Sequence, residues 1–566
     1  MNTNLTTTST PIVPPPDFPV VWANPDDAHY HWTRDREHMP DPLTPMFNSV
    51  AALAATDALH RTANVYDEAV VKRCYTTINT YSYAHLVPFT GAPEEVAARA
   101  RRYREKVWAV VSRLRQIWED EWRPALDDDW AFWAAFDLEA ADLDALAVHL
   151  EESLPRVAHL YEIHYLMGPP MWFAIDAFET FYCDLFPGAT PLDAHRLLQG
   201  FDNKTLEIGR ALWRLRDLAQ ATPAVSRILI ERPAAEVWSA LAASAEGQDF
   251  LDEMRAFLRA YGGRSDLWDW GYPSWEDDPT PVINNLKNYL AQPDRDLRAE
   301  LTLAAAEREA AIAQARYDLA GYPQPVLDRF EQLLDAAQTA LVLTENHTYY
   351  IDFNGFGWLH RLIGACGQRF AIAGRLDDAS DVFYLTLPEL RAMLADPTLD
   401  HAARAASRRA EAEHWAAYPE PAELGARPAE PVYLYSPDAR RMMRHIGGLV
   451  AEAPLPEAEP GQLRGQAGSP GKARGPARVI RSLAEAHRLQ PGDILVTTTT
   501  APPWTPLFLT AAAVVTDAGG LLSHGAVVSR EYRIPAVVGT RDATTRITDG
   551  QMLEVDGDQG LVTLLE

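Results

Sequence analysis

The sequence predicts a multidomain protein in which a large, mainly α-helical domain precedes a compact C-terminal α/β domain. Three observations predict this class: helical periodicity between about residues 48 and 420, a Pro- and Gly-rich stretch after it, and strand-like runs beyond residue 475. A chain of 566 residues is long enough for roughly two to four domains. We expect a disordered tail over 1–20, the helical domain over 21–420, a hinge or linker over 421–470 and the α/β domain over 471–566.

Composition supports each of the first two parts. The start, MNTNLTTTSTPIVPPP, is rich in Thr and Pro, which is typical of a disordered tail. Within the helical domain, residues 296–320 are rich in Ala, Glu and Arg and predict a long exposed helix. Breakers such as Gly168-Pro169-Pro170 are expected to separate the helical segments.

The C-terminal domain is predicted from β-rich runs that Gly and Asp-Gly turns separate. Helices fit at residues 483–489 and 523–532. Strands are expected at residues 477–480, 494–498, 513–516, 536–538, 553–555 and 561–565.

Charge and cysteine content limit the possible partners. With 79 acidic against 51 basic residues, the formal net charge is −28, which repels nucleic acid and anionic membranes. No apolar run reaches the length of a membrane span, and the start lacks the basic and apolar regions of a secretory signal. Three well-separated cysteines without a CxxC pair argue against a disulfide framework or a structural zinc site. A cytoplasmic protein is expected, and no metal site is predicted.

The run VVTDAGGLLSHGAVVSREY, residues 514–532, contains the strongest candidate for chemistry. A buried strand is expected to end at Thr516. The pair Gly519 and Gly520 allows a tight turn and a close approach of the backbone to a ligand.

A histidine follows this turn at the start of a predicted helix. Ser523 is a good N-cap, which places His524 in the first helical turn. A phosphoryl group on that imidazole would meet unpaired backbone N–H groups and the positive end of the helix dipole. Arg530 is expected on the flank of the helix, where it would add positive charge. Imidazole suits this chemistry because its pKa of ~6.5 leaves it neutral near pH 7. The alternative is a histidine that only packs or hydrogen-bonds at a helix start.

Four ordered motifs over residues 468–566 resemble a known family. The stretch TDAGGLLSHGAVVSREYRIPAVVGT resembles the signature of the swivelling phosphohistidine domain in phosphoenolpyruvate synthases, pyruvate phosphate dikinases and rifampin phosphotransferases, which are phosphoenolpyruvate-utilising enzymes. The stretches GSPGKARGPARVI, ILVTTTTAPPWTPLF and DGQMLEVDGDQGLVTLL resemble the family's opening strand, its Thr/Pro/Trp/Thr/Pro loop and its closing strand.

The resemblance implies a role for each matched residue. In these families, the histidine that matches His524 accepts the phosphoryl group. The implied phosphate pocket consists of Thr516, Gly519, Gly520, Ser523 and Arg530. The sequence departs from the pattern at Leu521-Leu522, where Met-Thr is frequent, and at Arg533, where Gly is usual. These departures affect the fine shape of the pocket.

Two further motifs resemble the ends of the middle domain of the rifampin-type and phenylphosphate synthase groups. They are WTRDREHMPDPLTPMF at 32–47 and GQRFAIAGRLDDASDVFYLTLPEL at 367–390. The first motif leaves no room before it for an ATP-grasp domain, and the chain has no Walker-type Gly-rich loop. This layout is closest to phenylphosphate synthase-like systems, which divide ATP binding and the carrier histidine between subunits. The resemblance therefore implies an ATP-grasp subunit in trans that binds ATP and Mg²⁺.

The acceptor site has less specific candidates. Asp35, Arg36 and His38 lie beside the first of these motifs, where an Asp or His would deprotonate an attacking hydroxyl. Alternatively, they cap or brace the first helix. Two polar-aromatic clusters are further candidates: Arg73 with Asn79, Tyr81 and Tyr83, and Glu345 with Asn346 and His347. At helical spacing, such clusters usually brace the interior.

The expected function is that of a phosphotransferase subunit. His524 would carry a phosphoryl group from ATP to the hydroxyl of a small-molecule acceptor such as a phenol or another organic alcohol, swinging about residues 450–470. Two alternatives remain: a phosphorylation-coupled dehydratase that acts on a small molecule, and a non-catalytic regulatory or binding homologue.

Overall fold

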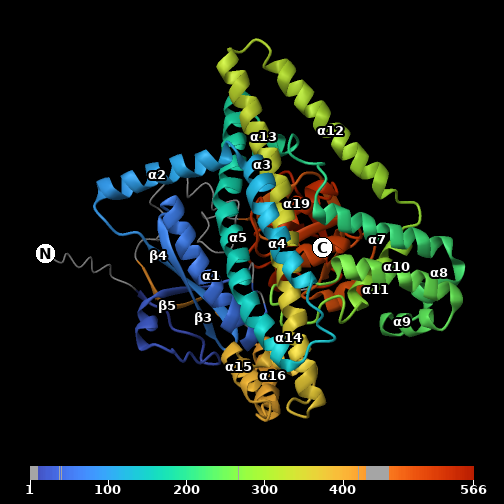
Figure 1. Cartoon of the computed structure of the whole chain (residues 1–566). Helices are drawn as coiled ribbons and strands as arrows, with labels where there is room; N and C mark the ends of the chain where they lie inside the picture. Colours follow the sequence, from blue (N-terminus) through green and yellow to red (C-terminus); the bar gives the residue numbers. More distant parts are fainter. Residues whose placement is uncertain are drawn as a thin grey trace.

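A helical body and a C-terminal α/β domain make up the chain, as the sequence predicts (Figure 1). The computed structural model describes residues 10–36, 39, 41–265, 267–418, 420–428 and 458–565. The candidate His38 and the central part of the expected linker, residues 429–457, lie outside the described residues. No described helix is long and apolar enough to cross a membrane. All three cysteines are free thiols.

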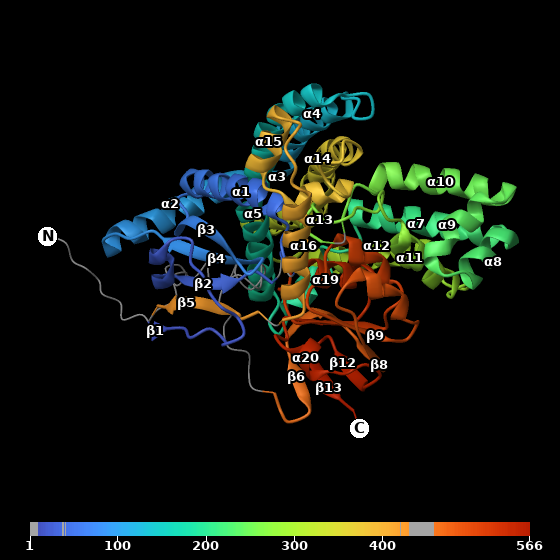
Figure 2. The same ribbon diagram turned by 90° about the horizontal axis from the view of Figure 1, so that it is seen from below.

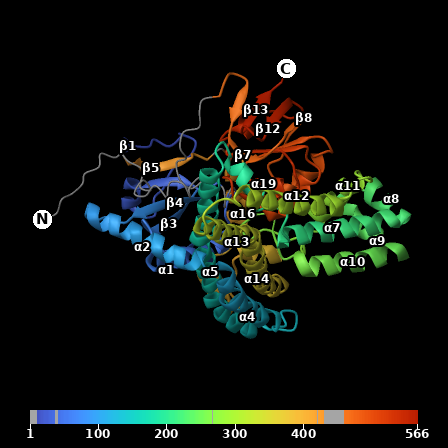
Figure 3. The ribbon, with the colours of Figure 1, turned by 90° about the horizontal axis from the view of Figure 1, so that it is seen from above.

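Two long helices, α5 and α13, run through the middle of the helical body (Figures 1 and 3). The helices of this part are α1 (Pro45–Tyr66), α2 (Pro93–Val111), α3 (Leu114–Ile117), α4 (Arg123–Ala134), α5 (Leu143–Leu185), α6 (Pro191–His195), α13 (Gln324–His347), α14 (Asn354–Ile372), α15 (Leu387–Ala395) and α16 (Ala402–Ala416). Short 3₁₀ segments lie at η1 (Pro25–His29) and η4 (Ala379–Tyr384), and π-helical segments at η2 (Trp118–Trp122) and η3 (Thr348–Phe353).

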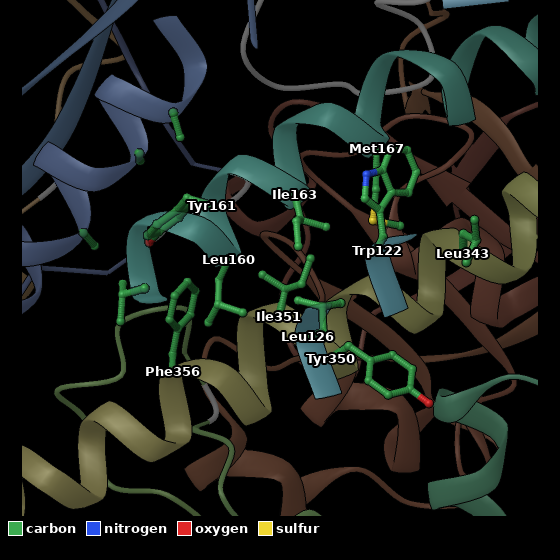
Figure 4. Close-up of a cluster of buried hydrophobic side chains, with 14 of the residues drawn as sticks. Trp122, Leu126, Leu160, Tyr161, Ile163, Met167, Leu343, Tyr350, Ile351 and Phe356 are labelled. Carbon is green, nitrogen blue, oxygen red and sulfur yellow. The ribbon is translucent and has the colours of Figure 1, made fainter. Parts of the chain in front are cut away.

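Apolar side chains from α5 and from the α13–α14 region meet in the core of this body. Figure 4 shows Leu160 and Ile163 of α5 beside Ile351 of η3 and Leu126 of α4. All four side chains are buried. Burying such a side chain contributes roughly 1.5–3 kcal/mol, so this seam holds the central helices together.

Helix α5 continues through the expected breaker at Gly168-Pro169-Pro170. A proline has no N–H to donate within a helix, so Pro170 leaves the carbonyl of Leu166 without its usual donor. The hydroxyl of Tyr66 donates to that carbonyl at 2.8 Å. Packing of α1 against α5 therefore compensates for the break that the sequence suggests.

A second group of helices extends to one side of the body (Figure 3). It comprises α7 (Lys204–Ala221), α8 (Pro223–Glu231), α9 (Ala234–Ala242), α10 (Ala245–Tyr261), α11 (Thr280–Leu290) and α12 (Leu297–Asp318). Helix α12 is the long helix expected at 296–320.

A small N-terminal sheet, which the sequence analysis did not predict, lies against the helical body (Figure 1). Its strand order is β1-β5-β2-β4-β3, with β1 (Thr10–Pro11), β2 (His31–Arg34), β3 (Val70–Ile78), β4 (Tyr81–Pro88) and β5 (Glu423–Arg427). Strand β1 pairs with β5, and Phe18 is 1% exposed. The expected disordered tail over 1–20 is therefore wrong for residues 10–20, and the expected domain boundary at 420 falls short of β5.

The cluster of Arg73, Asn79, Tyr81 and Tyr83 belongs to this sheet and not to a helix. Antiparallel pairing joins β3 and β4 through Asn79 and Thr80, whose φ angles are 49° and 68°. Two residues with positive φ match the right-handed twist of a hairpin. The β-branched and aromatic runs on both sides of this turn are the signal for strands that was overlooked.

The C-terminal domain is an eight-stranded sheet in the order β6-β13-β12-β8-β9-β10-β11-β7 (Figure 2). Its strands are β6 (Gln462–Arg464), β7 (Gln466–Ser469), β8 (Lys472–Val479), β9 (Ile494–Thr497), β10 (Ala513–Thr516), β11 (Ala536–Val538), β12 (Met552–Asp556) and β13 (Leu561–Leu564). Its short helices are η5 (Leu483–Arg488), η6 (Pro502–Trp504), α18 (Thr505–Phe508), α19 (His524–Glu531) and α20 (Ala543–Arg546).

The six strand predictions in this domain are confirmed to within a few residues, except that β8 begins five residues before its expected start at 477. The expected helix at 483–489 is a 3₁₀ segment. Strands β6 and β7 lie inside the expected linker over 421–470, so the C-terminal domain begins earlier than predicted. Both are edge strands with polar residues, which hid them in the sequence.

The C-terminal domain packs on the second group of helices (Figure 3). Helix α11 contacts η5, α7 contacts α18, and buried side chains of both parts form one hydrophobic cluster. The hydroxyl of Tyr289 on α11 donates to the carbonyl of Pro506 at 3.1 Å. This contact brings the start of α19 against the helical body.

Candidate active site

The loop between β10 and α19 gathers most of the residues predicted from the sequence. Strand β10 ends at Thr516, as expected, and the Thr516 hydroxyl donates to the carbonyl of Ala518 at 2.7 Å. Gly519 has a φ of 117°, a conformation that L side chains rarely adopt. A Cβ atom there would lie 2.8 Å from Oγ of Ser523. Glycine is therefore needed to fold the loop back over the helix start.

Helix α19 begins at His524, as predicted, but Ser523 does not cap it with its side chain. The Ser523 backbone has the extended conformation of an N-cap, with φ −61° and ψ 151°. Its hydroxyl donates to the carbonyl of Gly520 at 2.8 Å, within a tight turn in which the Ser523 N–H binds the same carbonyl at 3.1 Å. Because the hydroxyl is used in the turn, it leaves the N–H groups at the helix start open to another acceptor.

Arg530, predicted on the flank of α19, is buried there. Its guanidinium donates to the carbonyl of Gly468 at 2.6 Å and to that of Leu521 at 2.8 Å. Burial lowers the pKa of Arg530 to about 10, against the opposing effect of nearby Glu179 and Glu531. That side of α19 faces β7. Arg530 ties the histidine loop to the sheet.

The imidazole of His524 lies between the two domains, with its side chain 9% exposed. Its Nδ1 atom is 3.3 Å from Oε2 of Glu345, at the C-terminal end of α13. Its Nε2 atom is 3.1 Å from Oγ1 of Thr505, at the start of α18. The edge of Phe508 packs on the ring, with centroids 6.0 Å apart. The two ring nitrogens therefore face different domains.

Glu345 is a buried carboxylate held for this contact. The hydroxyl of Thr205, on α7, donates to its Oε2 at 2.6 Å. Burial alone would raise the pKa of Glu345, but the neighbouring imidazole of His524 and the Thr205 hydroxyl outweigh it and lower the pKa. Glu345 was grouped with Asn346 and His347 in the sequence analysis, although bracing was the favoured interpretation. Thr205 gave no signal in the sequence.

Two threonines beside the imidazole were not identified from the sequence. The Thr505 hydroxyl donates to the carbonyl of Pro502 at 2.7 Å. The buried Thr500 hydroxyl has no hydrogen-bond partner and lies close to Gly525, where a Cβ would be 2.9 Å from its oxygen. Both threonines belong to the TTTTAPPWTP stretch, and they place hydroxyl groups at the start of α19.

The acceptor candidates at the N-terminal sheet lie in a separate polar region. Arg36 donates to the Glu420 side chain at 3.0 Å and to its carbonyl at 3.0 Å, which ties the segment after β2 to the segment before β5. Asp35 is 1% exposed, and the Arg73 guanidinium lies 3.3 Å from the hydroxyl of Tyr75. Burial raises the pKa of Tyr75, and Arg73 and Asp35 act on it in opposite directions.

This polar region extends to α5 and to the end of α13. Burial and the neighbouring Tyr75 raise the pKa of Tyr165 on α5. The ring of His164 contacts Tyr165 edge-on, with centroids 5.0 Å apart. His164, His347 and Asp352 bring three possible metal-ligand atoms within 4.8 Å of one another. Among the described residues, this is the one such group, and the sequence analysis predicted no metal site.

Comparisons with known proteins match the helical body and the C-terminal domain to different domain families. The rifampicin phosphotransferase fourth domain matches residues 177–345, and the mobile domain of phosphoenolpyruvate-utilising enzymes matches residues 489–560. Chondramide synthase cmdD of Chondromyces crocatus is 39% identical over 97% of this chain and 14% of its own length.

Two further relatives match a shorter part. The rifampicin phosphotransferase of Streptomyces sviceus is 33% identical over 64% of this chain and 40% of its own length. The prodigiosin synthesizing transferase PigC of Serratia marcescens is 31% identical over 64% of this chain and 39% of its own length. The chain therefore spans at most 40% of the length of these relatives. The His524 loop lies inside the segment that matches the mobile domain of phosphoenolpyruvate-utilising enzymes, and Glu345 is the last residue of the segment that matches the rifampicin phosphotransferase fourth domain, so the chain shares both domains with these enzymes.

Proposed function

We propose that this protein is a phosphotransferase in which His524 carries a phosphoryl group from ATP to a hydroxyl of a small-molecule acceptor. The observation that carries this proposal is the placement of one imidazole between two domains, with Nδ1 beside a buried carboxylate and Nε2 at the hydroxyl of Thr505. A carrier histidine needs one nitrogen for phosphorus and one for a proton. This arrangement assigns these tasks to different atoms.

Nε2 is the nitrogen that accepts phosphorus. The carboxylate of Glu345, 3.3 Å away, favours a proton on Nδ1, so the lone pair remains on Nε2. A phosphoryl group on Nε2 would lie near the hydroxyls of Thr500 and Thr505 and the start of α19. The Thr505 hydroxyl can turn from the Pro502 carbonyl towards a phosphoryl oxygen, because its O–H rotates freely. Backbone N–H groups and the helix dipole add electrostatic stabilisation.

Glu345 activates the leaving imidazole. While its carboxylate holds a proton on Nδ1, the acceptor oxygen attacks phosphorus, the Nε2–P bond breaks, and its electron pair returns to Nε2. The ring then leaves as neutral imidazole, and the acceptor hydroxyl releases its proton to solvent. Because Glu345 belongs to α13, this activation operates only when the C-terminal domain is docked on the helical body. Phosphohistidine would be longer-lived away from this position.

ATP with Mg²⁺, bound by an ATP-grasp component, is the proposed donor. Support comes from relatives named rifampicin phosphotransferase, and from the family's use of a mobile carrier domain. The acceptor is proposed to bind in the helical body, close to Glu345. Positioning and charge neutralisation supply most of the catalysis in such transfers.

A second candidate function uses the same phosphoryl transfer to drive synthesis. Two relatives are named for products rather than for phosphorylation: chondramide synthase and the prodigiosin synthesizing transferase. In this version the acceptor is activated as a phosphate ester, which is then lost in an elimination or a condensation. Product mass separates the two functions, because a simple phosphotransferase adds a phosphoryl group and an activating enzyme releases it as inorganic phosphate.

Labelling of His524 tests the proposal directly. The full chain is incubated with an ATP-grasp component and ATP labelled at the β-phosphate, and in parallel with phosphoramidate, a chemical phosphoryl donor to imidazoles. We expect acid-labile, base-stable label on the wild-type protein from both donors, and at least a hundredfold less on His524→Gln.

The outcome that contradicts the proposal is equally clear. If phosphoramidate leaves no label on His524, or if His524→Gln carries as much label as the wild type, the imidazole is not a phosphoryl carrier. The non-catalytic homologue is then favoured. His487→Gln is the matched control, because His487 lies on the same domain in η5 and is expected to leave the labelling unchanged.

A further inference from the structure

Three side chains from α5, α13 and η3 of the helical body form a group that the proposed transfer does not use. His164 lies on α5, His347 is the last residue of α13, and Asp352 lies on the π-helical segment η3. Nδ1 of His164 is 3.3 Å from Oδ1 of Asp352, and Nε2 of His347 is 4.0 Å from Oδ2. The two imidazole rings have centroids 5.0 Å apart.

The hydrogen bond of His347 fixes which of its nitrogens faces the group. Nδ1 lies 2.9 Å from the carbonyl of Leu343, which has no hydrogen to give, so Nδ1 carries the proton and donates it. Nε2 of the neutral ring then presents a lone pair towards Asp352. A backbone carbonyl that orients a histidine in this way is typical of metal ligands.

Asp352 supplies the second, independent observation. Its side chain is 4% exposed, and its Oδ2 is buried without a hydrogen-bond partner. A buried carboxylate oxygen that faces the lone pair of a nitrogen is unfavourable unless a cation lies between them. The π-helical segment inserts an extra residue between α13 and α14, and such insertions are frequent at functional sites. Here the segment aims Asp352 at the two imidazoles.

We propose that His164, His347 and Asp352 bind one divalent transition-metal ion. Two imidazole nitrogens and one carboxylate oxygen suit Zn²⁺, Mn²⁺ or Co²⁺ better than Mg²⁺ or Ca²⁺, which prefer all-oxygen sites. Ligand atoms around such an ion are about 3–3.5 Å apart when the bonds are about 2.0–2.2 Å long. The three candidate ligand atoms lie within 4.8 Å of one another, so the group must close on binding the ion.

Three protein ligands leave coordination positions open for water or substrate. His347 lies two residues beyond Glu345, and its imidazole is near enough to contribute to the lowered pKa of Glu345. On the proposed function, on which this role rests, the ion binds the acceptor oxygen and makes loss of its proton easier. Glu345 activates the leaving group, and the ion activates the attacking group. Glu345 and the ion therefore act on different groups of the same reaction.

The test is metal binding by the full chain after removal of metals with a chelator. We expect close to one equivalent of Zn²⁺ or Mn²⁺ to be retained after dialysis, as measured by elemental analysis. Co²⁺ added in their place is expected to give visible absorption typical of nitrogen and oxygen ligands. His164→Ala and the isosteric Asp352→Asn are expected to weaken binding at least tenfold.

Controls on the same helix make the result specific. His159→Ala removes another histidine of α5, whose Nδ1 is 2.9 Å from a single aspartate, Asp129, and should leave metal binding unchanged. If the wild type binds no ion stoichiometrically, or if both cluster variants bind like the wild type, the group is an ordinary His–Asp ion pair and the proposal is wrong.

The outcome is independent of the carrier function. His524→Gln is expected to bind the metal with the affinity of the wild type, since His524 is not a ligand. Label on His524 without metal binding would overturn only the metal site. Metal binding without label would overturn only the proposed phosphoryl transfer.

Discussion

At the scale of single residues, the decisive contact joins His524 to Glu345, which lie 179 positions apart in the sequence. A motif identifies His524, because its neighbours in the chain are also its neighbours in space. Glu345 comes from another domain, so no local pattern distinguishes it from a bracing carboxylate. Its buried contact with the His524 imidazole and the hydrogen bond from Thr205 distinguish it in the structure. Sequence analysis therefore singled out His524 by its motif, and named Glu345 only within a cluster for which bracing was the favoured interpretation.

Glu345→Gln should separate the loading of the carrier from its discharge. The amide keeps the shape but removes the charge that holds a proton on Nδ1, so label is expected to form on His524 within about twofold of the wild-type level. Loss of the label to acceptor or water should slow by about 100-fold, in the range of general acid–base effects. The measurement is the decay of acid-labile phosphate after the donor is removed.

Two further variants serve as a milder change and a control for Glu345→Gln. Thr205→Val removes only the hydrogen bond that orients Glu345, and a smaller slowing is expected. Glu331 lies on α13, like Glu345, and forms an exposed ion pair with Arg316 of α12. In the control variant Glu331→Gln, the label should decay at the wild-type rate. Equal decay rates for Glu345→Gln and the wild type would show that the carboxylate does not act on the leaving ring.

Gly519 offers a second prediction at this scale. Gly519→Ala places a Cβ 2.8 Å from the Ser523 oxygen in addition to the strain of a positive φ. Gly461→Ala has the same kind of strain, with φ 83°, but nothing lies within 4 Å of its Cβ. We expect unfolding free energy to fall by about 1 kcal/mol for Gly461→Ala and by about 2–3 kcal/mol for Gly519→Ala. Urea denaturation measures both, and equal losses would mean that the loop relaxes without cost.

At the scale of elements, six of the eight strands of the C-terminal domain were predictable because they are short, largely buried and bounded by turns, whereas the polar edge strands β6 and β7 were not. The hairpin of β3 and β4 was missed because its neighbours are helical and because its polar residues were read at helical spacing. Helix α5 contains three prolines, and at Pro170 the Tyr66 hydroxyl from α1 replaces the missing hydrogen-bond donor. Local sequence therefore predicts an element where its own residues determine its conformation. It fails where contacts with a distant segment do, as in the Tyr66 contact with α5.

Helix α15 carries a prediction on pH and stability. At its start, Glu389 accepts hydrogen bonds from the Thr386 N–H at 2.8 Å and from Arg408 at 2.7 Å. Burial opposes ionisation, but Arg408, Thr386 and Arg404 outweigh it and lower the pKa of Glu389 to about 2. Because the folded pKa lies below the unfolded value, the ionised carboxylate stabilises the fold above about pH 4.5. That contribution disappears as the pH falls towards 2.

Glu389→Gln keeps a cap acceptor but removes the charge. We expect the unfolding free energy of the helical body to decrease by about 1–2 kcal/mol at neutral pH. The difference from the wild type should stay constant between pH 8 and 5 and shrink below pH 4.5. Urea denaturation across this pH range measures it. A difference that does not change with pH would mean that the amide disturbs packing rather than charge.

At the scale of the whole molecule, the boundaries of the domains were the least predictable feature. Strand β5 pairs with β2 although helices α1 to α16 lie between the two strands in the chain, and no local signal connects Gly425 to His31. The docking of the C-terminal domain on α7 and α11 was likewise beyond sequence analysis, because it depends on surfaces distant in the chain. Both features follow from burial of apolar area that only the folded structure reveals.

Cross-linking should trap the docked arrangement. Arg533 of the C-terminal domain and Glu307 of α12 form an ion pair at 3.0 Å, and both side chains are exposed. In a variant with the native cysteines replaced, Arg533→Cys and Glu307→Cys can be joined by a cleavable bis-maleimide. We expect labelling of His524 by an ATP-grasp component to fall at least tenfold and to recover after cleavage. Full labelling of the cross-linked protein would contradict domain movement between loading and discharge.

The apolar contact between the C-terminal domain and α7–α11 has a consequence for whatever loads the histidine. When the C-terminal domain moves away from α7 and α11, apolar side chains of the shared cluster such as Trp504 become exposed to water, which makes the undocked state less stable. A donor protein that covers these side chains with its own apolar surface removes this cost. We therefore expect the choice of donor to depend on apolar complementarity more than on opposite charge. Added salt should then leave the encounter intact or tighten it, despite a chain of net charge −28.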